Sequence, residues 1–92
     1  MIRRVLISKR AEKQLRSVPR HIRKNLLDWV RLVETDGVEA VRRILGFHDE
    51  PLRGARAGQR SIRLSRSYRA IYVERNGLAC FLSVEEVSKH KY

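Results

Sequence analysis

The spacing of apolar residues along the chain is helical in the first half and alternating in the second. Residues 9–18 and 20–36 carry apolar side chains three or four positions apart, which is the period of a helix with one buried face. Ser8 can cap the first helix, and Pro19 separates the two. The pattern predicts a helical hairpin near the N-terminus, preceded by a short strand over residues 2–7.

Three strands are predicted after the helices, over residues 58–64, 68–74 and 78–84. In the first of them Ile62 and Leu64 share one face, so Arg63 lies on the other. The dipeptide Asn76-Gly77 is typical of the turn that joins two antiparallel strands. The last strand is apolar without interruption, which indicates a central, buried position.

The remaining segments carry weaker signals. Residues 38–45 can add a helical turn or two, residues 46–57 read as an irregular connector, and residues 85–92 read as a short polar tail. The order β-α-α-β-β-β predicts an α+β domain, a small and mostly antiparallel sheet with the helical hairpin packed on one face. Without a repeat or a linker, 92 residues form one domain, 1–92.

Composition narrows the class of partner. The chain has 21 Lys and Arg against 10 Asp and Glu, a formal charge of +11, and such a surface attracts polyanions in a salt-dependent way. A hydrophobic content of 42% argues against a disordered basic tail. No apolar stretch approaches about 18 residues, so we expect no membrane partner. The lone Cys80 cannot form an internal disulfide, and we expect a cytoplasmic protein.

The densest cationic stretch spans residues 50–69, where no acid follows Glu50. It contains six arginines, Arg53, Arg56, Arg60, Arg63, Arg66 and Arg69. Taken alone, such a run is more often a solvated surface than a reactive one. The strand alternation favours substrate contact for Arg63, because its neighbours face the core.

Several segments in this order resemble one family. They are Pro51-Leu52-Arg53-Gly54, Tyr68-Arg69-Ala70-Ile71-Tyr72 and the terminal His90-Lys91-Tyr92. With the predicted element order, they make nearly the whole chain similar to the RelE/ParE superfamily of small toxins from bacterial toxin-antitoxin pairs. The resemblance implies a cognate antitoxin protein as partner.

The superfamily has two branches with different activities. RelE-branch toxins are ribosome-dependent, metal-independent endoribonucleases that cut translated messenger RNA, whereas ParE-branch toxins poison DNA gyrase. Resemblance to the RelE branch implies the 70S ribosome and messenger RNA as partners, with neither a metal nor another cofactor. The alternatives are a gyrase inhibitor and a basic RNA-binding module without activity.

The resemblance to the RelE branch assigns roles to four residues. Arg69 and Arg63 match positions whose guanidinium groups hold the scissile phosphate and stabilise the charge that develops on it. His90 matches the near-terminal histidine and becomes the candidate general acid. Tyr92 matches a terminal aromatic residue that can stack on a base or orient the phosphate.

The candidate general base is Glu50, which matches a glutamate with this role in some members. His48 lies two residues away and stays open as an alternative. Arg53 stands where many members have lysine, which keeps the charge but disfavours a lysine base. Arg56 and Arg60 are expected to guide RNA phosphates without a chemical role, as is Arg53.

Overall fold

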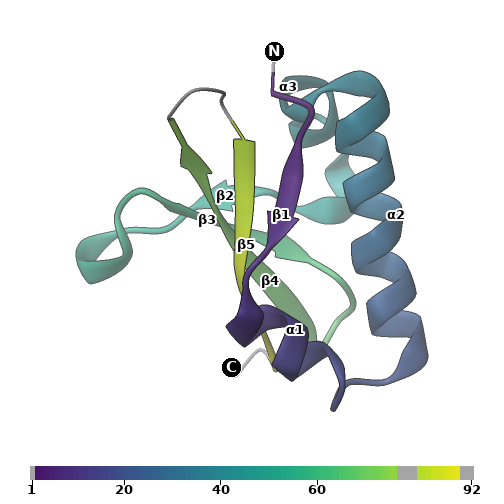
Figure 1. The fold of residues 1–92 in the computed structure, drawn as a ribbon. Helices are drawn as coiled ribbons and strands as arrows, with labels where there is room; N and C mark the ends of the chain where they lie inside the picture. Colours follow the sequence, from purple (N-terminus) through teal and green to yellow (C-terminus); the bar gives the residue numbers. More distant parts are fainter. Residues whose placement is uncertain (1, 77–80, 90–92) are drawn as a thin grey trace.

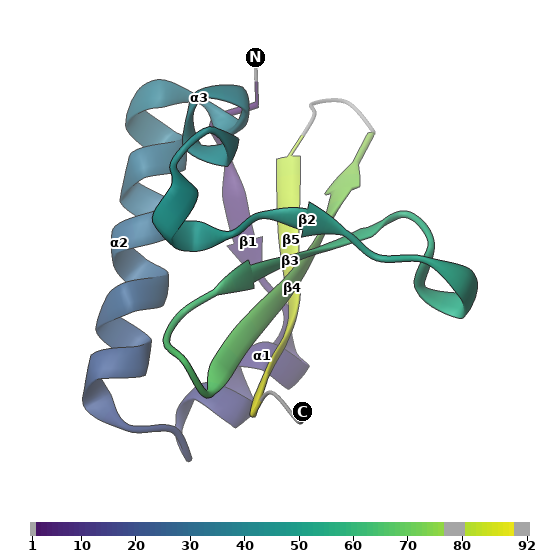
Figure 2. The same cartoon turned by 180° about the vertical axis from the view of Figure 1, so that it is seen from behind.

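The computed structural model describes residues 2–76 and 81–89. Its strands are β1 (Val5–Ile7), β2 (Glu50–Pro51), β3 (Gln59–Arg63), β4 (Tyr68–Arg75) and β5 (Phe81–Lys89). Its helices are α1 (Lys9–Leu15), α2 (Arg20–Asp36) and α3 (Val38–Arg42), with short 3-10 turns η1 (Leu45–Phe47) and η2 (Gly54–Arg56). Long α2 runs along one side of the sheet, and the segment between β2 and β3 extends from the opposite side (Figures 1 and 2).

The strands form one mixed sheet in the order β1-β5-β4-β3-β2. β1 runs parallel to β5, and the other three pairs are antiparallel. This arrangement confirms the predicted α+β class and the mostly antiparallel sheet. It also places β5 between two other strands, as its apolar sequence indicated. Within the described ranges, no helix has the length and apolar character needed to span a bilayer.

The predicted polar tail is wrong for residues 85–89, which continue β5. The pairing with β4 shifts where Ile71 faces Glu86 and Tyr72 faces Val84, so Glu85 is an extra residue in β5. Such a bulge interrupts the alternation of a strand. It lets Val84 and Val87, three positions apart, both face the core. A prediction based on strict two-residue alternation therefore ended this strand too early.

The predicted irregular connector also contains a strand. β2 is only two residues long, and it pairs with β3 through Glu50 opposite Ser61 and Pro51 opposite Arg60. Just beyond it, the Leu52 amide donates to the Gln59 carbonyl at 2.9 Å. The sheet thus gains an edge strand that carries one of the candidate site residues.

A single core lies between the helices and the inner face of the sheet. From α2 it takes the fully buried Ile22, Leu26, Trp29 and Val33, and from the sheet Ile62, Ala70, Tyr72, Val84 and Val87. The rings of Trp29 and Tyr72 meet with centroids 5.0 Å apart. Each large apolar side chain buried here contributes about 1.5–3 kcal/mol. Because apolar side chains fill most of the inner face in this way, the polar side chains of the strands lie mainly on the outer face.

Ser8 joins β1, α1 and β5. Its Oγ accepts a hydrogen bond from the Ala11 amide at 3.1 Å, which caps α1 as the sequence predicted, and donates to the Glu85 carbonyl at 3.2 Å. We expect Ser8→Ala to lower the free energy of unfolding by about 1–2 kcal/mol, because the cap and the second bond are both lost. Urea unfolding measures this loss, with exposed Ser67→Ala as the matched control. Equal stability of the two variants would contradict it.

Candidate active site

The outer face of the sheet presents two arginines side by side. Arg63 on β3 is directly opposite Arg69 on β4. Their neighbours Ile62 and Ala70 are fully buried on the inner face, so the pleat turns both guanidinium groups outward. Like charges at opposite positions of a sheet repel each other unless an anion lies close by. This pair of strands therefore forms a place for an anionic group.

Glu50 supplies an anion in the described structure. Its Oε1 accepts a hydrogen bond from Arg69 at 2.8 Å, and its Oε2 lies 3.6 Å from Nε2 of His48. The Glu50 side chain is 44% exposed, whereas that of Arg69 is 18% exposed. One candidate base, Glu50, thus contacts the candidate phosphate-binding arginine, and the other, His48, lies beside Glu50. In the ion pair of Glu50 and Arg69 the carboxylate is the more accessible partner.

The ion pair between Glu50 and Arg69 reaches across β3, because β3 lies between β2 and β4. Ser61 of β3 is opposite Glu50 and is fully buried. Its hydroxyl oxygen has no hydrogen-bond partner among the residues that the structure describes. Ser61 therefore contributes a small side chain to this face, so that the long side chains of Glu50 and Arg69 can meet over β3.

The other predicted site residues lie at different places. Arg53 is exposed at the start of η2, and Arg56 at its end bonds Glu86 on β5 at 3.0 Å. Arg60 faces the inner side and bonds Asp49 at 2.7 Å. His90 and Tyr92 lie outside the described residues. The structure thus brings together Glu50, His48, Arg63 and Arg69, but sets Arg60 apart from them, and the predicted roles of all these residues stay predictions.

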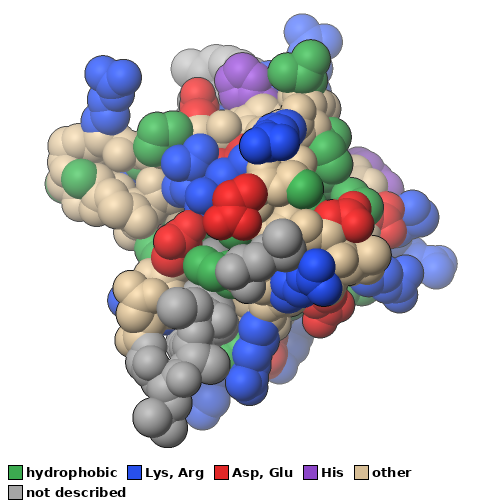
Figure 3. Space-filling view, turned by 90° about the horizontal axis from the view of Figure 1, so that it is seen from above, with side chains coloured by type: hydrophobic (Ala, Val, Ile, Leu, Met, Phe, Trp, Pro, Cys, Tyr) green, Lys and Arg blue, Asp and Glu red, His purple; other side chains and the backbone are tan. Residues whose placement is uncertain are grey.

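Glu86 holds two cations at this face. Its Oε1 lies 3.0 Å from Arg56 and 3.2 Å from Arg10, and its side chain is 12% exposed. Burial raises the pKa of Glu86, but hydrogen bonds from Arg56 and Ser88, with the nearby positive charges, outweigh burial and lower the pKa overall. Acidic side chains also lie directly among basic ones where the molecule is seen from above, in Figure 3. The net positive charge is therefore partly compensated locally.

Several solved structures share the fold of this chain. The YoeB/ParE toxin from Agrobacterium tumefaciens superposes with a TM-score of 0.68 at 18% identity, over 96% of this chain and 99% of that one. An archaeal RelE–RelB complex from Pyrococcus horikoshii OT3 gives 0.66 at 24% identity, over 97% and 96%. The chain has the RelE/ParE toxin fold.

Another example of the RelE/ParE fold is YafQ from E. coli strain BL21(DE3), with a TM-score of 0.65 at 18% identity, covering 92% of this chain and 90% of that one. No protein-family model and no curated protein sequence matches the chain. The similarity to these toxins is thus a similarity of backbone fold, and the description of the candidate site comes from the side chains of this chain.

Sequence reasoning missed a buried polar group beneath the site of this RelE/ParE fold. The Asp49 side chain is 1% exposed, and its carboxylate accepts hydrogen bonds from Arg60 and from the Tyr72 hydroxyl. Burial raises the pKa of Tyr72, and the bond to Asp49 adds to this effect more than Arg42 opposes it. The phenol therefore stays protonated and donates. The one signal in the sequence that could have predicted an inward-facing Asp49 is its position next to Glu50, because neighbouring residues of an extended chain face opposite sides.

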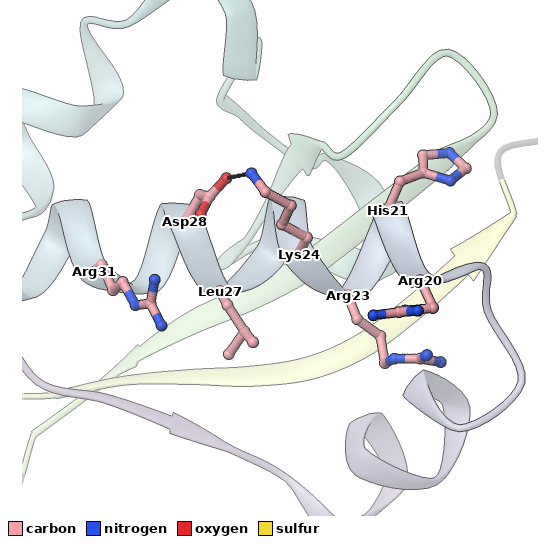
Figure 4. A pocket seen from close by; sticks show the side chains of 7 residues that line it. All are labelled: Arg20, His21, Arg23, Lys24, Leu27, Asp28 and Arg31. Atoms are coloured by element: carbon pink, nitrogen blue, oxygen red, sulfur yellow. Dashed lines mark hydrogen bonds and ion pairs between the residues drawn. The ribbon is translucent and has the colours of Figure 1, made fainter.

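The described part of this RelE/ParE fold also has an open hollow of about 540 Å³ along α2, remote from Glu50. Its lining, shown in Figure 4, comes from one exposed helix face: Arg20, His21, Arg23, Lys24, Leu27, Asp28 and Arg31. Lys24 and Asp28 form an ion pair at 2.9 Å. No group of three His, Cys, Asp or Glu able to hold a metal ion occurs in residues 2–76 and 81–89. The hollow is a mostly basic helix surface, and its carboxylate, Asp28, is paired with Lys24.

Proposed function

We propose that this chain is the toxin of a type II toxin-antitoxin pair and cleaves messenger RNA on the ribosome. One observation carries the proposal: Glu50 is hydrogen-bonded to Arg69 at 2.8 Å, with His48 beside it and Arg63 on the next strand. A base next to two guanidinium groups suits the cleavage of a phosphodiester that carries its own 2′-hydroxyl nucleophile. The RelE/ParE fold supports the same reaction class.

In the proposed reaction Glu50 takes the proton of the ribose 2′-hydroxyl. The 2′-oxygen attacks the adjacent phosphorus, the bond from phosphorus to the 5′-oxygen breaks, and a 2′,3′-cyclic phosphate forms. Arg69 and Arg63 stabilise the negative charge that builds up on the phosphoryl oxygens. His90 gives a proton to the departing 5′-oxygen, so the proton taken at the start is matched by the one given at the end.

The other proposed roles concern positioning. Tyr92 stacks on a base beside the scissile bond or orients its phosphate. Arg53 and Arg56 guide the RNA backbone, as phosphate contacts place a nucleic acid without reading its sequence. Arg60 is left out of this role, because it faces the inner side and bonds the buried Asp49 carboxylate. The ribosome, by holding the message in place, supplies much of the rate that so small a set of groups cannot supply alone.

The proposed regulator is a cognate antitoxin that covers the outer face of the sheet. An RelE with the same fold was solved together with RelB. The charge of +11 favours a partner segment rich in Asp and Glu. Such a segment can compete for Arg63 and Arg69 and thereby exclude RNA.

Induction of the chain in bacterial cells tests the proposal. We expect growth arrest within minutes and new messenger RNA 5′ ends that lie inside translated frames and disappear when ribosomes are kept off the message. Intact messages with DNA breaks would instead indicate the gyrase-poisoning alternative. Intact messages with unimpaired growth would indicate an RNA-binding module without activity.

A further inference from the structure

The position of Glu50 depends on a weak element. β2 has two residues and lies at the edge of the sheet, paired on one side only. Edge strands of this length have few bonds and open at low cost. Its pairing with β3 and the bond from the Leu52 amide to Gln59 hold the Glu50 backbone through few bonds, so a further attachment of this segment to the core would stabilise its position.

Asp49 provides that attachment from the opposite face. Its Oδ1 accepts a hydrogen bond from Nε of Arg60 at 2.7 Å, and its Oδ2 accepts one from the Tyr72 hydroxyl at 2.6 Å. With 1% of its side chain exposed, it is more enclosed than the partners of the other ion pairs described above. Asp49 immediately precedes β2, and its bonds lie on the inner face, whereas Glu50 bonds Arg69 on the outer face. Holding Asp49 inward therefore keeps the next side chain, Glu50, directed outward.

The partners of Asp49 are themselves fixed. Tyr72 packs on Trp29 in the core, and its hydroxyl accepts a bond from Nε of Arg42 at 3.0 Å. Arg42, from α3, also bonds Glu74 at 2.6 Å. The centre of this network, the Asp49 carboxylate and the Tyr72 hydroxyl, is buried, so a displacement there leaves a desolvated polar group unpaired.

We propose that Asp49 is a positioning residue that holds the Glu50 carboxylate against Arg69. The inference rests on the proposed function for its consequence in catalysis, but the local claim concerns geometry alone. Without the two bonds of Asp49, β2 and the His48 turn before it, which has a left-handed φ of 46°, lose their anchor to the core. Glu50 then samples positions away from the reacting hydroxyl.

The catalytic test uses single-turnover cleavage of messenger RNA on programmed 70S ribosomes, with toxin concentration varied. We expect Asp49→Asn to lower the rate at saturating toxin about 10- to 100-fold, while the half-saturating concentration changes little. Glu85→Gln is the matched control, since it also removes a carboxylate bonded to an arginine, Arg75, but lies away from Glu50. It should keep the wild-type rate.

A second measurement separates positioning from general destabilisation. In ¹⁵N NMR spectra we expect the Arg69 Nε–Hε signal to shift in Asp49→Asn and to stay in place in Glu85→Gln. If Asp49→Asn does not fold, Tyr72→Phe removes one of the two bonds, keeps the ring, and should give a several-fold lower rate with a smaller signal shift.

The outcomes decide between the claims. A folded Asp49→Asn protein with a wild-type rate and an unmoved Arg69 signal overturns the positioning role. Equal rate losses in Asp49→Asn and Glu85→Gln overturn it too, because they would reflect stability. If the wild-type chain cleaves nothing, the proposed function fails, and the Arg69 signal still tests whether Asp49 sets the ion pair.

Discussion

Replacing Arg69 with alanine should abolish growth arrest and reduce cleavage of ribosome-bound messenger RNA about 10²–10³-fold. The guanidinium lies on the outer sheet face at the Glu50 carboxylate, 2.8 Å away, where it can bind the phosphoryl oxygens of a substrate. Charge stabilisation of this kind acts mainly on the transition state, so the rate at saturating toxin should fall. Single-turnover cleavage and mapping of 5′ ends measure the loss.

The fold should survive this change. The ion pair has a half-exposed carboxylate, and such pairs contribute at most about 1 kcal/mol. Arg69→Lys keeps the charge but loses the bidentate geometry and should be partly active. Arg31→Ala, on the exposed face of α2, is the matched control and should keep the saturating rate. Full toxicity of Arg69→Ala would show that the site lies elsewhere.

The helical half of the fold could be predicted from the sequence because its signals are local. Ser8 caps α1, Pro19 precedes α2, and Gly37 ends α2 with a positive φ of 85°. Each of these residues acts on a backbone within a few positions of its own. The apolar stripe of α2 likewise reflects one continuous buried face.

The strands were predictable only where their alternation was regular. The bulge at Glu85 moves the period of β5 by one residue, and β2 is too short to have a period. Both depend on pairing with segments far along the chain, which local patterns do not record. The sequence therefore located the sheet without giving its edge or its full length.

The candidate site, too, was predictable only in part. Resemblance singled out Glu50 and Arg69, and the structure places them in contact. Asp49 escaped notice because an acid beside an acid in a polar segment looks solvated, and its burial arises from contacts 11 and 23 residues away, with Arg60 and Tyr72. Arg60, grouped with the phosphate guides, is turned inward by that same carboxylate.

Replacing Glu50 with glutamine should lower the cleavage rate at saturating toxin about 10²–10⁴-fold, whereas His48→Gln should lower it less than about 10-fold. Glutamine keeps the shape of the side chain and an oxygen that can accept the bond from Arg69, so this variant removes the base and little else. Nε2 of His48 lies 3.6 Å from the Glu50 carboxylate, and it is this carboxylate that bonds Arg69. We propose that His48 orients the Glu50 carboxylate, and that Glu50 accepts the proton of the 2′-hydroxyl. A larger loss with His48→Gln than with Glu50→Gln would reverse these roles, and the imidazole would then be the base, with Glu50 holding it and Arg69 in place.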